Sequence, residues 1–204
     1  MFTLRECKEE GNCSILGRMN ELAQTPQSVV AKIMECFALR GDQHYGEEVT
    51  EREHALQCAY FAAQAGEPEG LVVACLLHDM GHLLHDLGED IAEKGIDAQH
   101  EEHGARWLAK HFPPEIVEPV RLHVAAKRYL CARQPGYHDS LSEASQRSLA
   151  LQGGVMSERE AQEFEGNPHA DWAVRLRRYD DEGKVTALVT PSLESYRALL
   201  EAQI

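Results

Sequence analysis

The sequence lacks any stretch of about 18 uncharged apolar residues, the length that a membrane-spanning helix needs, so it predicts no transmembrane segment. It also lacks the apolar core of a signal peptide, because residues 1–14 carry several charged side chains, and this predicts a cytoplasmic protein. Basic residues are few: 20 Lys and Arg stand against 34 Asp and Glu, which leaves a net charge of −14. Such a surface repels polyanions, so nucleic acid and anionic membranes are not expected partners.

No Cys-x-x-Cys pair occurs among the six cysteines, so neither a zinc knuckle nor a disulfide framework is expected. Cys58 and Cys75 lie among small apolar neighbours, where reduced thiols pack as small hydrophobic side chains. The 204 residues, 43% of them apolar, are enough for one domain with a substantial core. The oligomeric state stays open.

Helical periodicity runs through nearly the whole chain and predicts an all-α bundle of about eight to ten helices. Thr50 with Glu53, and Ser157 with Glu160, are capping boxes that mark two helix starts. The uncharged run 71–77 fits a buried strand or a helix buried on all sides; we predict a helix, because no second strand-like run exists to pair with it. Residues 83–99 are expected to form a loop with a short helical turn. The predicted helices are 28–39, 50–66, 70–79, 100–111, one with Pro119 in its first turn that runs to 133, 142–151, one opened by Ser157, 167–184 and 192–203.

Eleven histidines are the unusual feature of the composition, and the strongest local signal is the pair His78-Asp79 directly after the apolar run. Burial of such groups requires partners. A divalent metal takes an imidazole and a carboxylate together. Alternatively, Asp79 and His82 only satisfy backbone groups at a helix end, and the dipeptide alone does not decide between these two interpretations.

Further donors lie on other predicted helices, on faces that otherwise belong to the core. A metal site explains them jointly, whereas separate explanations as core or surface side chains would require several coincidences. They are His54, His100 with Glu101 beside it, His123 with Lys127 at i,i+4, and Arg177, Asp180 and Lys184 at i,i+3,i+7.

In their order these residues resemble the HD-domain metalloproteins, whose pattern is a histidine, a His-Asp pair and a distal aspartate. Here the pattern corresponds to His54, His78-Asp79 and Asp180. Within that superfamily the chain most resembles the mixed-valent diiron oxygenase branch, which includes 2-amino-1-hydroxyethylphosphonate dioxygenase and, more distantly, myo-inositol oxygenase. The other matching segments are Gly46-Glu47 to Glu53, Leu77 to His82, His100-Glu101-x-x-Gly104-Ala105, His123-x-x-x-Lys127, Leu151-Gln152-Gly153-Gly154 and Arg175-x-Arg177-x-Tyr179-Asp180-Asp181-x-x-Lys184.

The resemblance implies a single HD domain over 1–204, a helical bundle in which a metal-binding core of about 44–184 is covered by an N-terminal and a C-terminal helix. It implies two iron ions, a mixed-valent Fe2+/Fe3+ pair. One would be bound by His54, His78, Asp79 and Asp180, and the other by Asp79, His100 and His123, with Asp79 as the bridge. The first four ligands suffice for one metal, so the last two histidines would be surplus without a second. This nitrogen-rich set suits iron or manganese better than magnesium.

The implied substrate is an organophosphonate. Lys127 and Arg177 lie one turn from expected ligands and suit its oxygens. The resemblance adds His82, Ser145 and Ser148 to this anion site, makes His82 and Lys127 the catalytic side chains, and places Glu47 against the substrate ammonium group, although by itself Glu47 is equally well a solvated loop acid. The implied reaction uses O2 to cleave the C–P bond of a 1-hydroxy-2-aminoethylphosphonate, with the amine free or trimethylated, and gives phosphate and an amino acid.

The chain departs from its relatives at one position, three residues before Glu47. Where the phosphonate oxygenases carry a tyrosine thought to occupy an iron position until substrate displaces it, this chain has His44, followed by Tyr45. Three alternatives stay open: His44 is the gate, Tyr45 replaces it through a shifted loop, or the gate is missing.

Two other functions compete with the oxygenase. A metal-dependent HD phosphohydrolase acting on a nucleotide or other phosphoester would use metal-activated water and no O2. The two additional histidines and the positions of Lys127 and Arg177 favour the oxygenase. A non-enzymatic regulatory or scaffold module is disfavoured, because a structural metal site has no use for open coordination positions and an anion site.

Overall fold

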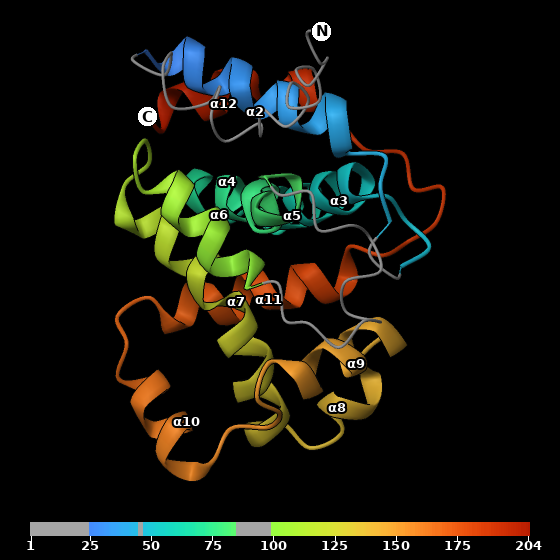
Figure 1. Ribbon diagram of the computed structural model, residues 1–204, viewed down its shortest axis with the longest axis vertical. Helices are drawn as coiled ribbons and strands as arrows, with labels where there is room; N and C mark the ends of the chain where they lie inside the picture. Colours follow the sequence, from blue (N-terminus) through green and yellow to red (C-terminus); the bar gives the residue numbers. More distant parts are fainter. Residues whose placement is uncertain (1–24, 45–46, 85–98) are drawn as a thin grey trace, which may run out of the picture.

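The computed structural model describes residues 25–44, 47–84 and 99–204, and all regular secondary structure within these ranges is helical (Figure 1). The expected all-α bundle is therefore confirmed. The elements are α2 (Pro26–Arg40), α3 (Glu51–Gln64), α4 (Glu69–Leu77), α5 (Met80–Leu84), α6 (His100–Leu108), α7 (Pro114–Arg133), α8 (Tyr137–Ser140), α9 (Glu143–Leu151), α10 (Glu158–Glu165), α11 (Ala170–Glu182), the 3-10 helix η1 (Leu193–Tyr196) and α12 (Arg197–Ala202).

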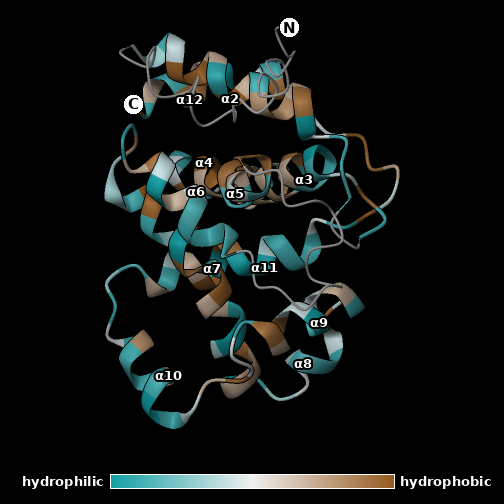
Figure 2. Cartoon of the chain, in the orientation of Figure 1, coloured by the Kyte–Doolittle hydropathy of each residue, from teal (hydrophilic) through white to brown (hydrophobic). Residues whose placement is uncertain are grey.

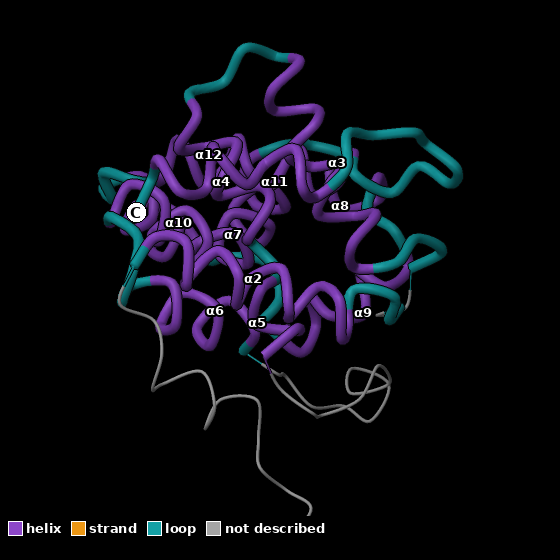
Figure 3. Tube along the Cα trace, turned by 90° about the horizontal axis from the view of Figure 1, so that it is seen from above, coloured by secondary structure: helices purple, strands orange, loops and turns teal. Residues whose placement is uncertain are grey.

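The helices are stacked in layers along the long axis of the molecule. Helices α2 and α12 pack together at one end, and α3, α4, α5 and α6 form the next layer (Figure 1). Helices α7 and α11 pack against each other beneath that layer, and α8, α9 and α10 lie at the far end. Seen from above, α7 and α11 run beneath the centre of the bundle (Figure 3). The middle layers thus bring α3, α4, α6, α7 and α11 together.

Helix α4 is the centre of the hydrophobic core. Its residues 71–77 are all buried, and the band of hydrophobic colour in Figure 2 marks this helix among more amphipathic neighbours. It contacts α3, α7, α11 and α12, so every face of it is covered. A helix that is apolar all round must be enclosed in this way. The prediction of a helix rather than a strand for this run is confirmed.

Both predicted capping boxes are present. The Thr50 and Ser157 side chains accept hydrogen bonds from the backbone N–H groups of Glu53 and Glu160, whose carboxylates accept in return. The sequence prediction missed a third box, Thr25 with Ser28, because serine rather than glutamate returns the hydrogen bond there. Helix α2 consequently begins at Pro26, two residues before the predicted start.

Several predicted boundaries were wrong. Helix α7 begins at Pro114, so Pro119 lies inside the helix and not in its first turn. Proline has no N–H to donate, so one backbone carbonyl in the first turn of α7 lacks its helical hydrogen bond. The predicted final helix is divided into η1 and α12. The loop expected before residue 142 contains the short helix α8, and helix α6 ends at Leu108, three residues early.

In the segment 83–99, only the end of helix α5 and Gln99 fall within the described residues. Cys36, Cys58, Cys75 and Cys131 are free thiols, as expected, while Cys7 and Cys13 lie outside the described residues. Among the helices described, none combines the length and the apolar character that a membrane crossing requires.

Helices α5 and α6 approach so closely that glycine is required at their contact. A Cβ atom built on Gly81 would lie 1.9 Å from the backbone oxygen of His100. Across the contact, a Cβ on Gly104 would come within 3.0 Å of the Gly81 nitrogen. The two glycines therefore allow the first residue of α6, His100, to lie beside the end of α4.

Candidate metal centre

The six expected metal ligands come from five places in the fold and meet in the interior. His54 lies in the second turn of α3, and His100 opens α6. His78 is the C-cap of α4, so the buried apolar helix itself carries the His-Asp pair into the core. His123 lies within α7 and Asp180 near the end of α11. All are buried except Asp79, whose side chain is 16% exposed.

The first pair of imidazoles is His54 and His78. Their Nε2 atoms lie 3.1 Å apart, while both Nδ1 atoms point away from each other to backbone carbonyls. Nδ1 of His54 donates to Gly183 at 2.8 Å, and Nδ1 of His78 donates to Cys75 at 2.8 Å. Hydrogen bonds of this kind fix the tautomer and leave the Nε2 lone pair facing inward.

The second pair, His100 and His123, has the same arrangement. Their Nε2 atoms lie 3.0 Å apart, and Nδ1 of His123 donates to the carbonyl of Val120 at 2.7 Å. Nδ1 of His100 instead faces a carboxylate, with Glu101 Oε2 at 3.5 Å. Both pairs therefore present two ring nitrogens to a common point.

Asp79 lies between the two pairs and turns one oxygen to each. Its Oδ2 lies 3.2 Å from Nε2 of His78 and 3.6 Å from Nε2 of His54. Its Oδ1 lies 3.3 Å from Nε2 of His100 and 3.6 Å from Nε2 of His123. Asp180 faces the first pair only, 3.5 Å from His54 and 3.9 Å from His78. A carboxylate in the position of Asp79 can bridge two cations.

Burial and neighbouring charges shift the pKa values of the groups at this centre. Burial disfavours the charged form of His78, yet the Asp79 carboxylate outweighs burial and raises the pKa of His78 to about 9. Burial lowers the pKa of His123 to about 3, and the charge on His100 acts in the same direction. Burial would raise the pKa of Asp180, but Arg177 holds it well below its usual value. Two lone pairs that face each other at 3 Å repel, so each pair requires a proton or a cation between its nitrogens.

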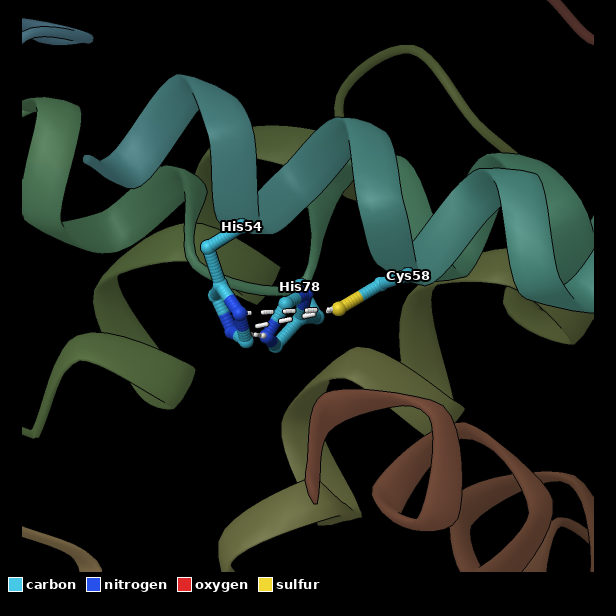
Figure 4. A group of neighbouring side chains, drawn as sticks. All are labelled: His54, Cys58 and His78. Atoms are coloured by element: carbon cyan, nitrogen blue, oxygen red, sulfur yellow. Dashed lines mark hydrogen bonds between the residues drawn. The ribbon is translucent and has the colours of Figure 1, made fainter. Parts of the chain in front are cut away.

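Cys58 also lies near the first pair, and its Sγ is within 4.8 Å of donor atoms on both His54 and His78 (Figure 4). Sγ lies 3.8 Å from Nδ1 and 3.9 Å from Nε2 of His54. A donor that shares an ion with Nε2 must lie on the Nε2 side of the ring, whereas equal distances place Sγ against the middle of it. Burial also raises the pKa of the Cys58 thiol well above its usual value. Cys58 thus packs against His54 and is not a candidate ligand.

Next to the metal centre, three cations converge on two serines of helix α9. Nζ of Lys127 donates to Ser148 Oγ at 2.8 Å, and Nζ of Lys184 donates to Ser145 Oγ at 3.0 Å. The Arg177 guanidinium reaches Ser145 Oγ at 3.5 Å. Lys127, Arg177 and Ser145 are buried. Four of the predicted anion-binding residues, Lys127, Ser145, Ser148 and Arg177, therefore lie in one cluster, with positive charge that the overall net charge of the protein does not reveal.

The two cations expected to bind the phosphonate, Arg177 and Lys127, differ in their hydrogen-bond partners. Arg177 is fixed by Asp180 at 2.6 Å, by Asp181 and by the hydroxyl of Tyr137 at 3.3 Å. Lys127 has no carboxylate this close among the described contacts. Burial, reinforced by the Arg177 charge, lowers the pKa of Lys127 to about 7. At neutral pH, Lys127 can therefore exchange a proton, whereas Arg177 stays charged.

Glu47 adjoins this cluster. Its Oε1 accepts hydrogen bonds from Ser142 Oγ at 2.6 Å and from Lys184 Nζ at 2.7 Å. The sequence predicted Lys184 only as sharing a helix face with Arg177, and not among the substrate residues. That helix face was wrong, because α11 ends at Glu182 and Lys184 lies just beyond it. Its position four residues after Asp180 is the signal that would have found it.

Of two further predicted residues, His82 contacts a ligand of the centre, and His44 lies exposed beside Glu47. The ring of His82 stacks on that of His100, with centroids 4.2 Å apart and an interplanar angle of 16°. His44 is exposed, and its Nδ1 lies 3.2 Å from the backbone oxygen of Glu47. Tyr45 lies outside the described residues, so the tyrosine-gate alternatives stay predictions.

The sequence prediction also missed Glu51, which is buried one turn before His54 on α3. Burial, with Asp79 and Asp180 adding to it, raises the pKa of Glu51 well above its usual value. A buried carboxyl group whose neutral form is favoured therefore lies one turn from the expected ligand His54. The i,i+3 spacing from His54 was its only signal in the sequence.

Comparison of the sequence with known proteins identifies the family of this chain. The HD domain family matches residues 52–152, which include five of the six expected ligands, all but Asp180. The chain is 43% identical over 194 residues to hydroxymethylphosphonate dioxygenase of Gimesia maris, with 93% of each chain covered. It belongs to the HD-domain phosphonate dioxygenase family.

Two other proteins are similar to this chain over most of its length. The glycine-betaine-forming [1-hydroxy-2-(trimethylamino)ethyl]phosphonate dioxygenase of Leisingera caerulea is 43% identical over 178 residues, which cover 87% of this chain and 91% of that protein. An uncharacterized protein of Acanthamoeba polyphaga mimivirus is 32% identical over 199 residues, covering 97% and 90% of the two chains. These two dioxygenases are equally similar to this chain in identity, yet the substrates in their names differ in whether C1 carries an amine-bearing group.

The donor set fits a pair of cations of the kind such a family would hold. Three of the four inward-facing imidazoles are fixed by backbone carbonyls, and the shared carboxylate offers one oxygen to each pair. Imidazole nitrogens with carboxylate oxygens suit iron better than magnesium. A metal cofactor is thus supported by the chemistry of the residues themselves.

Proposed function

We propose that this protein is an iron-dependent oxygenase that cleaves the C–P bond of a 1-hydroxyphosphonate. Its relatives are named for this chemistry, and the observation that supports it most is the second imidazole pair, His100 and His123, on the far oxygen of Asp79. A mononuclear phosphohydrolase would need only the first four ligands. The second pair would be without purpose in such an enzyme.

The proposed overall reaction joins R–CH(OH)–PO3 with one O2 to give R–COOH and hydrogen phosphate, which balances all atoms. The C1–P bond breaks, C1 loses four electrons as it becomes a carboxyl group, and O2 takes up these four electrons in the products. With an aminomethyl or trimethylammoniomethyl group as R, the acid is glycine or glycine betaine. Bound to the two imidazole pairs and the two aspartates, iron would supply the activation of O2 and the oxidation of C1.

The protein's own residues would bind the phosphonate and orient C1. Arg177, held by Asp180 and Asp181, offers a fixed planar donor, and Lys127 and Lys184 add charge from two other sides. Ser145 and Ser148 complete this anion site with hydroxyl groups. His82 stacks on the ring of His100, beside the second imidazole pair.

Lys127 and Glu47 would have the roles that depend on protons and charge. With a pKa of about 7, Lys127 can neutralise a phosphonate oxygen and give up a proton to the departing phosphate at Nζ. Glu47 is paired with Lys184 in the structure without substrate. If Lys184 turns to the phosphonate, the Glu47 carboxylate is released to accept a substrate ammonium group.

Phosphate release with and without O2 tests this proposal. Iron-loaded protein is incubated with hydroxymethylphosphonate and with 2-amino-1-hydroxyethylphosphonate, in air and under argon, and phosphate and consumed O2 are measured. We expect phosphate only in air, with one O2 consumed per phosphate. Equal release under argon would identify a hydrolase and contradict the proposal.

A further inference from the structure

Among the four histidines of the centre, Nδ1 of one faces a side chain, whereas Nδ1 of each of the other three faces a backbone carbonyl. Nδ1 of His54, His78 and His123 each donates to a carbonyl at 2.7–2.8 Å. Nδ1 of His100 has only the carboxylate of Glu101 within reach in the described contacts. Backbone carbonyls cannot be changed by substitution, so Glu101 is the one orienting partner that the side-chain sequence controls.

The local structure explains why a side chain is used here. His100 is the first residue of α6, and among the described residues its Nδ1 forms no hydrogen bond to a backbone carbonyl. Its own carbonyl is enclosed against Gly81 of helix α5. His78 and His123, by contrast, take the carbonyl three residues earlier in the chain. Among the described residues, the Glu101 carboxylate is therefore the acceptor available to Nδ1 of His100.

One oxygen of this carboxylate is also without a hydrogen bond. Glu101 Oε2 is a buried atom that forms no hydrogen bond, and the Glu101 side chain is only 13% exposed. A buried carboxylate oxygen that lacks a donor is costly. Nδ1 of His100, 3.5 Å away, is the donor that would satisfy it after a shift of about half an ångström, which is a typical adjustment when apo hydrogen bonds tighten.

We propose that Glu101 is a positioning residue for the second metal. Its carboxylate accepts a hydrogen bond from Nδ1 of His100 and thereby directs Nε2 of His100 to the ion that His100 would share with His123 and Asp79. The inference rests on the proposed function, because that function requires the second ion. A carboxylate on the outer nitrogen fixes the ring and increases the basicity of the coordinating nitrogen. Loss of such a partner typically costs tenfold to a hundredfold in metal affinity, roughly.

The test measures iron binding and not turnover. Full-length protein, Glu101→Ala, Glu101→Gln and the matched control Glu102→Gln are titrated with Fe2+ without O2 by equilibrium dialysis, and the electron paramagnetic resonance of the partly oxidised samples is recorded. Glu102 is the adjacent acid on the same helix, but its partner is Arg121 and not a metal ligand. Circular dichroism of each variant reports whether the helical fold is retained.

For Glu101→Ala we expect one iron bound as tightly as in the unchanged protein and a second bound about tenfold to a hundredfold more weakly, with loss of the coupled-pair signal. Glu101→Gln should recover part of the affinity, because its amide oxygen can still accept from Nδ1. Two irons bound equally tightly by Glu101→Ala and Glu102→Gln would overturn the role of Glu101. A single iron in the unchanged protein would instead overturn the proposed two-metal centre, and with it this inference.

Discussion

At the scale of single residues, Lys127 determines how the site responds to pH. Burial and the Arg177 charge lower the pKa of Lys127 to about 7, so the free protein carries the ammonium form below that pH and loses it above. We expect kcat/KM for hydroxymethylphosphonate to fall by up to about tenfold per pH unit above pH 7. Steady-state rates between pH 6 and 9 measure this.

Lys127→Arg provides the control, because arginine stays charged throughout this range. The phosphonate ionises identically with both proteins, so only the Lys127 contribution should disappear from the profile. A fall of the same size in Lys127→Arg would assign the pH dependence to a different group.

The carboxylate of Glu47 has a different role from the cations around it, since it faces Lys184 and Ser142 in a region built for anions. Glu47→Gln keeps the shape and removes the charge. We expect KM to rise at least several-fold for 2-amino-1-hydroxyethylphosphonate and to change little for hydroxymethylphosphonate, which has no ammonium group. Equal changes for both substrates would remove the ammonium-binding role.

At the scale of helices, the contact between α5 and α6 fixes the second imidazole pair. A methyl group on Gly81 would overlap the backbone of His100, so Gly81→Ala must push α6 away from Asp79. We expect Gly81→Ala to lower the free energy of unfolding by about 1–3 kcal/mol and to reduce bound iron. Thermal unfolding and iron analysis measure the two effects.

Gly166→Ala is the matched control, because an added Cβ there would meet its nearest neighbour at an ordinary 3.5 Å. Its unfolding temperature and iron content should stay close to those of the unchanged protein. If both variants lose iron equally, the close α5–α6 contact is not what positions His100.

The helices also show what local sequence can and cannot predict. Capping boxes and the buried run 71–77 depend on side chains within a few residues, and these were predicted correctly. The division of the last helix into η1 and α12, and the short helix α8, depend on packing against distant elements. Similarly, regular spacing and the family resemblance brought the six expected ligands to attention, whereas the carboxyl group of Glu51 and the Glu47–Lys184 pair became visible only through burial and proximity.

At the scale of the whole molecule, the side chains of the metal centre come from α3, the end of α4, α6, α7 and α11. An ion held by side chains from all of these binds the folded chain and not the unfolded one, so it stabilises the fold by mass action. At free iron of about 100 times Kd this contributes about 2.7 kcal/mol. For a chain of this size, that corresponds to an increase in Tm of about 5–10 °C.

Removing the iron should therefore lower Tm by that amount, and adding Fe2+ back under argon should restore it, as measured by scanning calorimetry. Asp79→Asn is the decisive variant, because Asp79 is the only side chain among the described residues that faces both imidazole pairs. Its Tm should respond far less to chelation than that of Glu102→Gln, which leaves the centre intact. If chelation leaves the Tm of the unchanged protein where it was, the converging histidines do not hold metal in the folded chain, and the oxygenase proposal loses its chemical basis.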